Sequence, residues 1–145
     1  MKMNSYLFII GLVAAIILSI YPCFINNGKG KTKVSKFVFY NTIGESLDEK
    51  NISFQLLEKF PYKQFINNED IDLINRATRI KQSYIWKGNI YGKLIFNNND
   101  SCIIKISRYG SFFRNFENNL LYSFKKETDM ESWQKLLNNF LSSKY

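Results

Sequence analysis

Residues 84–126 read YIWKGNIYGKLIFNNNDSCIIKISRYGSFFRNFENNLLYSFKK, and this stretch decides the fold class. Its apolar and aromatic residues gather in five runs: 85–86, 90–96, 102–109, 112–116 and 120–124. The runs are rich in Ile, Phe and Tyr, and short segments containing Gly, Asn or Ser separate them, which is typical of strands joined by turns. Because short connections favour antiparallel pairing of neighbours, the stretch predicts a β-meander of four to five strands.

Upstream of this stretch, the sequence predicts one further strand and two helices. Residues 34–40 contain Val, Phe and Tyr and read as the first strand. Residues 52–60 carry apolar side chains at helical spacing, and Pro61 would end that helix. Asn68 precedes three carboxylates and an apolar stripe, so it predicts the N-cap of a second helix that extends to Lys81.

Downstream of the stretch, the chain ends in an amphipathic segment. Thr128 and Glu131 have the spacing of a capping box, which predicts a helix beginning there and extending to about Ser143. Within it, Trp133 and Phe140 share the apolar stripe and should lie against the sheet. We therefore expect an α+β fold in which the antiparallel β-meander packs against two or three helices.

An uncharged, apolar segment precedes this domain. Residues 6–25 would span about 30 Å as a helix, the thickness of the hydrocarbon core of a bilayer. Tyr6 and Tyr21 lie near its ends, where aromatic rings favour the headgroup region, and Gly11 and Ala15 have the spacing of close helix contacts. The sequence thus predicts an uncleaved N-terminal transmembrane helix, the membrane anchor, over residues 1–25, a basic tether over 26–33 and a compact domain over 34–145.

The side of the membrane on which the domain lies depends on two opposing signals. A cluster of lysines after the apolar segment favours a cytoplasmic domain by the positive-inside rule. Short anchors in which a lysine precedes an apolar run more often export the domain attached to them. The frequent Asn and Lys residues are typical of an AT-rich genome. We expect a bacterial source, an anchor in the inner (cytoplasmic) membrane and a periplasmic domain. Cys23 follows Tyr21 and Pro22 rather than a lipobox, and we expect it to be a small apolar residue at the membrane boundary.

The composition excludes several classes of catalysis. The chain of 145 residues contains no histidine and only two cysteines. A Ser-His-Asp triad, a histidine zinc site and an imidazole proton shuttle are therefore absent. Glu69, Asp70 and Asp72 could act as paired carboxylates, but they fit the start of a helix. We expect a protein that is not an enzyme and that binds no metal or cofactor.

The net charge of +8 is shared between the N-terminal segments and the domain, because residues 34–145 carry 16 basic and 12 acidic side chains. Aromatic and cationic residues interleave between 86 and 114. In the first interpretation, the aromatic rings fill the core and the cations form a solvated face. In the second they form a protein interface, where Tyr, Trp and Arg dominate the binding energy. The interface residues we expect are Trp86, Tyr91, Arg108, Tyr109, Phe112 and Arg114.

These features favour an anchored, non-enzymatic binding protein, and most concretely an immunity protein that binds and neutralises a toxin from neighbouring bacteria. One alternative is a structural or accessory subunit of a membrane assembly, whose function would be lost on exchange of the anchor for an unrelated one. A nucleic-acid-binding domain is more remote, because aromatic and basic residues also suit bases and phosphates but no RNP, KH or OB signature is present. The expected partners are another protein and, through residues 6–25, the lipid bilayer.

Overall fold

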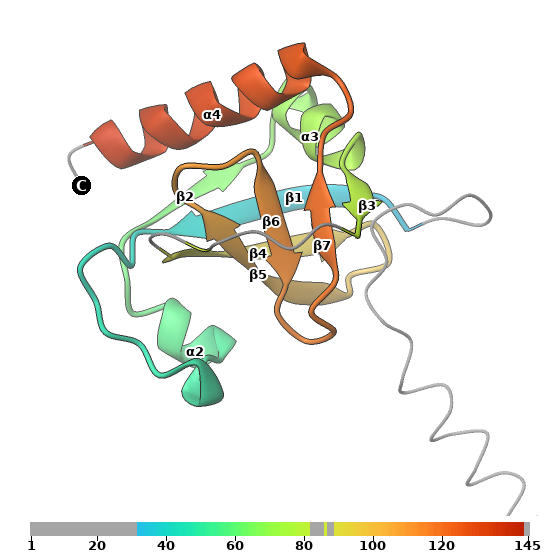
Figure 1. Ribbon diagram of the computed structural model, residues 1–145. Helices are drawn as coiled ribbons and strands as arrows, with labels where there is room; N and C mark the ends of the chain where they lie inside the picture. Colours follow the sequence, from blue (N-terminus) through green and yellow to red (C-terminus); the bar gives the residue numbers. More distant parts are fainter. Residues whose placement is uncertain (1–31, 82–85, 87–88, 144–145) are drawn as a thin grey trace, which may run out of the picture.

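The computed structural model describes residues 32–81, 86 and 89–143 (Figure 1). The predicted anchor with Tyr6, Gly11, Ala15 and Tyr21 lies outside the described residues, as does almost all of the predicted tether. Within the described residues, none of the helices has the length and hydropathy needed to span a membrane.

The domain is built on one antiparallel sheet of seven strands in the order β2-β1-β4-β5-β6-β7-β3. The strands are β1 (Val34–Tyr40), β2 (Tyr62–Phe65), β3 (Thr78–Ile80), β4 (Asn89–Phe96), β5 (Ser101–Ser107), β6 (Phe112–Asn115) and β7 (Leu121–Ser123). The helices are η1 (Glu49–Asn51), α2 (Phe54–Leu57), α3 (Asn68–Asn75) and α4 (Glu127–Ser142). The α+β class and the antiparallel meander from β4 to β7 are confirmed, whereas the sheet is larger than the four to five strands predicted.

Two strands were not predicted, and both form the edges of the sheet. β2 follows Pro61 and pairs with β1, and β3 pairs with β7. The helix predicted to continue to Lys81 ends at Asn75, because the β-branched residues Thr78 and Ile80 join the sheet next to β7 instead. Of the predicted strand at 85–86, Ile85 lies outside the described residues and Trp86 has no regular secondary structure.

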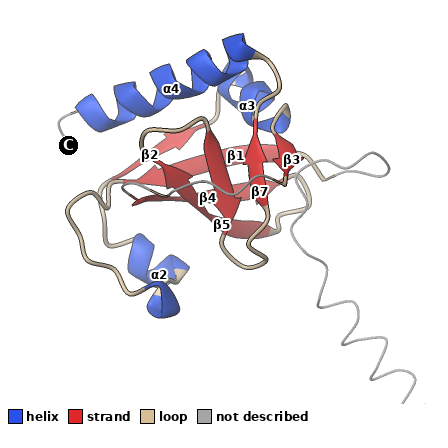
Figure 2. Cartoon of the chain, in the orientation of Figure 1, coloured by secondary structure: helices blue, strands red, loops and turns tan. Residues whose placement is uncertain are grey.

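One face of the sheet carries the main hydrophobic core. Helices α3 and α4 cover this face (Figures 1 and 2). Trp133 and Phe140 of α4 are fully buried there and meet the ring of Phe39 edge-on at 5.6 Å, as their spacing predicts. The close approach of β1, β4 and β5 beneath this core requires Gly92, because a Cβ there would lie 2.8 Å from the carbonyl oxygen of Val38.

The predicted capping box of α4 is wrong. The N-cap residue is Lys126, which makes no side-chain capping hydrogen bond, and Thr128 already lies within the first turn. The acidic Glu127 and Asp129 of that turn instead favour the positive end of the helix dipole. Asp129 also accepts three hydrogen bonds from Arg76, at 3.0, 3.1 and 3.2 Å, which join α4 to the end of α3.

The opposite face of the sheet is covered as well, by residues 41–60 (Figure 2). This segment leaves β1, forms η1 and α2, and returns to β2. Leu57 is fully buried against Val38, Tyr91 and Ile103. The two faces of β5 differ, since Ile104 and Ile106 enter the main core while Lys105 lies on the other face.

Candidate protein-binding site

The predicted interface residues lie toward one end of the sheet. β1 and β5 each pair antiparallel with β4, so they run in the same direction. The end of β5, where Arg108 and Tyr109 follow, therefore lies beside the end of β1 and about 20 Å from Val34, where the described chain enters the sheet. We call this the distal end: it consists of residues 41–47, residue 86 and residues 108–111.

At the distal end, the half-buried Arg108 packs beside the exposed Tyr109. Tyr109 is 67% exposed, the highest value among the large hydrophobic side chains of the described residues. The guanidinium carbon of Arg108 lies 5.2 Å from the centre of its ring, within range of a cation–π contact. A hollow of about 570 Å³ beside the pair is lined by α4 residues Gln134, Asn138, Leu141 and Ser142. The pair thus borders a concave surface that a partner could enter.

The turn that carries this pair is held in place by its neighbours. Ser123 Oγ of β7 donates a 2.7 Å hydrogen bond to the carbonyl oxygen of Ser111, and Gln134 of α4 contacts Ser111 Oγ at 3.5 Å. Gly110 leaves space that the ring of Phe112 occupies, so a side chain at residue 110 would clash with it. The surface presented by Arg108 and Tyr109 is therefore preorganised.

Three other predicted residues come together on the sheet face that residues 41–60 cover. The ring of Trp86 meets that of Phe112 edge-on at 5.1 Å, and the guanidinium carbon of Arg114 lies 5.1 Å from the centre of the Trp86 ring. Lys105 Nζ lies 5.5 Å from the centre of the same ring. A cation–π contact of this kind is stronger where water is excluded.

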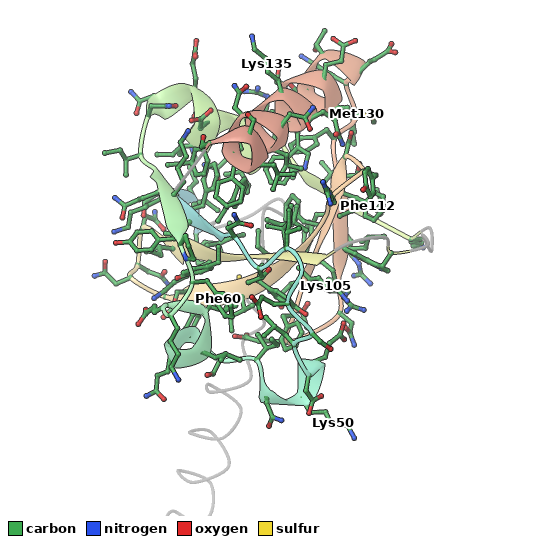
Figure 3. All side chains as sticks on the ribbon, turned by 90° about the vertical axis from the view of Figure 1, so that its left-hand side faces the viewer. Lys50, Phe60, Lys105, Phe112, Met130 and Lys135 are labelled. Carbon is green, nitrogen blue, oxygen red and sulfur yellow. The ribbon has the colours of Figure 1, made fainter. Side chains whose placement is uncertain are left out.

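A carboxylate completes this group. Glu49 of η1 accepts a hydrogen bond from Lys105 Nζ, and its other oxygen lies 3.6 Å from an Arg114 terminal nitrogen. The hydrogen bond from Lys105, together with the two positive charges, holds the pKa of Glu49 below its ordinary 4.5. We call Glu49, Trp86, Lys105 and Arg114 the charged cluster. Figure 3 shows Lys105 between the sheet and the short helix that carries Lys50.

Tyr91, the sixth predicted residue, is buried beneath this cluster rather than exposed. It pairs with Lys105 across the β4–β5 ladder and meets the ring of Phe116 edge-on. Burial, and to a smaller extent the charge of Glu49, raises the pKa of Tyr91 to about 12. A recess of about 390 Å³, lined by residues 42–47, Tyr91 and Arg108, connects Tyr91 with the distal end.

Sequence reasoning did not link Glu49 to this site. The two partners of the Lys105–Glu49 pair are 56 residues apart, and Glu49 precedes a helix of only four residues. One signal was available in the sequence, because alternate residues of a strand project from the same face. Tyr91, Lys105 and Arg114 share a face once the hairpin registers are known. Lys105, taken from the sequence as part of a solvated basic face, is in fact buried.

The three carboxylates considered for catalysis lie elsewhere. Glu69 and Asp70 stand in the first turn of α3, where Asn67 caps the helix and also donates to Asp70 at 2.6 Å. Together with Asp72 they border a groove of about 670 Å³ between β2, α3 and α4. Among the residues that the structure describes, no group of three or more metal-ligating side chains is close enough to hold an ion.

Comparison with known proteins finds no relative of this chain: no family model, no curated protein and no solved structure matches it. The residues of the chain itself are therefore the basis for assigning a function.

Proposed function

We propose that this protein is a membrane-anchored, non-enzymatic binding protein whose distal end recognises another protein. The observation that carries the proposal is the exposed Tyr109, packed by Arg108 on a turn that β7 and α4 hold in place. Tyr and Arg side chains that a rigid support holds at the surface are among the residues that contribute most to protein interfaces.

The position of the turn supports the same proposal. The chain enters the sheet at Val34, at the end opposite to Arg108 and Tyr109. An anchor that precedes Val34 would leave the distal end directed away from the membrane, where a soluble protein can reach it. We propose an inner-membrane location with the domain in the periplasm, and an immunity protein that neutralises a toxin from neighbouring bacteria as the most concrete form of this function.

The geometry favours a protein over nucleic acid as the partner. Single-stranded nucleic acid needs exposed cations that follow the phosphate backbone. Lys105 is buried and paired with Glu49, and Lys93 lies 3.6 Å from Glu58 with its Nζ over the ring of Phe54. Two of the cations that would contact phosphate are thus already engaged within the domain.

A protection assay tests this proposal. The full chain is expressed in bacteria that also receive the product of the neighbouring gene, and survival and binding are measured. We expect Tyr109→Ala to weaken binding by about 2 kcal/mol, roughly thirtyfold, and to abolish protection, with Arg108→Glu acting in the same direction.

Arg79→Glu provides the matched control. Arg79 is an exposed arginine on the edge strand β3, so its reversal changes the net charge equally without touching the distal end. Protection that survives both distal-end substitutions would exclude this surface. A chain that gives no protection and binds no product of the adjacent gene would contradict the immunity function.

A further inference from the structure

The charged cluster contains more positive charge than its own carboxylate balances. Lys105 and Arg114 face each other across the β5–β6 ladder, and Glu49 serves both. Only 6% of the Lys105 side chain is exposed, so its charge requires a nearby anion. The 3.6 Å contact of Glu49 with Arg114 is longer than a charge-assisted hydrogen bond, and Arg114 Nε is buried without a hydrogen-bond partner among the described residues. One carboxylate therefore does not fully satisfy the charges and hydrogen-bond donors of the two cations.

Glu49 is held less firmly than the cations it pairs with. Its side chain is 48% exposed, and η1 contains no buried residue. Lys105 and Arg114, by contrast, project from two paired strands in the middle of the sheet. Glu49 can thus move away with its loop, whereas the two cations stay in place and keep their need for an anion.

Trp86 covers one side of this position. Its ring lies over both cations and packs against Phe112, so it limits the access of water from one side. Cations in such a partly desolvated place bind a carboxylate more strongly than cations on an open surface do. The recess lined by residues 42–47, Tyr91 and Arg108 adjoins this place, because Tyr91, which lines it, is the cross-strand partner of Lys105.

We propose that Lys105, Arg114 and Trp86 form a carboxylate-binding pocket in which Glu49 is an exchangeable occupant, and that an acidic side chain of the protein partner replaces Glu49 on binding. This inference rests on the proposed function, and it adds the chemistry of the partner: an acidic segment that enters through the recess next to Arg108. Binding then couples the pocket to residues 41–60, since that segment must shift when Glu49 leaves.

The test uses acetate as a probe of the emptied pocket. In the full chain carrying Glu49→Ala, we expect sodium acetate to raise the melting temperature by several degrees more than sodium chloride of equal ionic strength. The double variant E49A/K105M should lose this acetate-specific rise. Glu58→Ala, which removes an exposed acid paired with Lys93 from the same covering segment but outside the recess, should respond to the two salts alike.

A second measurement does not depend on thermal unfolding. The chain contains two tryptophans, and Trp86 lies against the pocket while Trp133 is buried in the main core. Acetate should change the fluorescence of E49A, and the change should disappear in E49A/W86F. If folded E49A shows neither an acetate-specific rise nor a fluorescence change, the carboxylate pocket is overturned.

A third measurement concerns the partner. A hexaglutamate peptide should quench or shift Trp86 fluorescence in the wild-type chain, whereas a hexalysine peptide should not. Acetate binding to E49A without any response to hexaglutamate would overturn exchange by a partner. Neither result depends on Tyr109, so a failure of the pocket can be distinguished from a failure of the distal end in the protection assay.

Discussion

The two faces of the sheet differ in what they bury. The face under α3 and α4 is filled almost entirely with apolar and aromatic side chains, and Phe39, Phe113 and Trp133 form continuous ring contacts there. The face under residues 41–60 combines an apolar cluster around Leu57 with three ion pairs, three cation–π contacts and two buried tyrosines. One face thus provides most of the stability, while the other holds charges that a stable core alone does not require.

The largest expected effect comes from the apolar face. Trp133→Ala should lower the free energy of unfolding by about 3–5 kcal/mol, because it removes a fully buried indole that packs against three phenylalanines. Urea unfolding followed by circular dichroism measures the change. Trp133→Phe is the control: it keeps a ring and removes an indole N–H that has no hydrogen-bond partner among the described residues. An equal loss in both variants would contradict this account of the core.

Substitutions in the charged cluster should lower the free energy of unfolding by an intermediate amount. The amount should depend on whether the anion or the cation is removed. Glu49→Ala leaves Lys105 buried and unpaired. Removal of one partner from a fully buried ion pair lowers the free energy of unfolding by about 3–5 kcal/mol. Because Glu49 is half exposed, we expect Glu49→Ala to lower it by about 1–2 kcal/mol. Lys105→Met should cost less, since Glu49 can then turn toward water. Urea unfolding of the two variants compares them, and a larger loss for Lys105→Met would be evidence against a buried, anion-dependent lysine.

The smallest effect at neutral pH concerns Tyr91. Its pKa in the folded protein, about 12, exceeds the ordinary value of 10.0, so the folded state disfavours the tyrosinate. The stability that this residue contributes is fully present below pH 10 and is lost as the pH rises from 10 toward 12. We expect wild type and Tyr91→Phe to differ increasingly in urea midpoint over that interval. A constant difference between them across this pH range would show that the hydroxyl of Tyr91 titrates normally.

The sequence predicted those parts of the fold whose patterns are local. β1 has the predicted boundaries, and β4 to β7 and α4 agree with the prediction to within a few residues. β2 and β3 were missed because four and three residues carry no periodic signal, and both form only by pairing with a strand distant in sequence. In residues 76–80, this pairing with β7 outweighs the apolar spacing that favoured a longer helix.

The residues of the candidate site also divide into those that a local pattern indicates and those that depend on contacts between distant segments. Trp86, Phe112 and Arg114 were selected for residue type, and the sheet brings all three into contact. Residue type does not indicate burial, which is why Tyr91 was placed on the same surface as Tyr109 although only Tyr109 is exposed. Glu49 depends on a loop that crosses a sheet face, and no local pattern specifies where such a loop ends.

The two edges of the sheet also bear on how the protein tolerates crowding. An open sheet edge is a template for pairing between chains, and such pairing increases with local concentration, as it would if the proposed anchor gathered many copies on one membrane. Here β2 is only four residues long, follows a proline and carries Lys63, while β3 is three residues long and carries the exposed Arg79. Short, charged edges of this kind oppose the formation of intermolecular sheets at high local concentration.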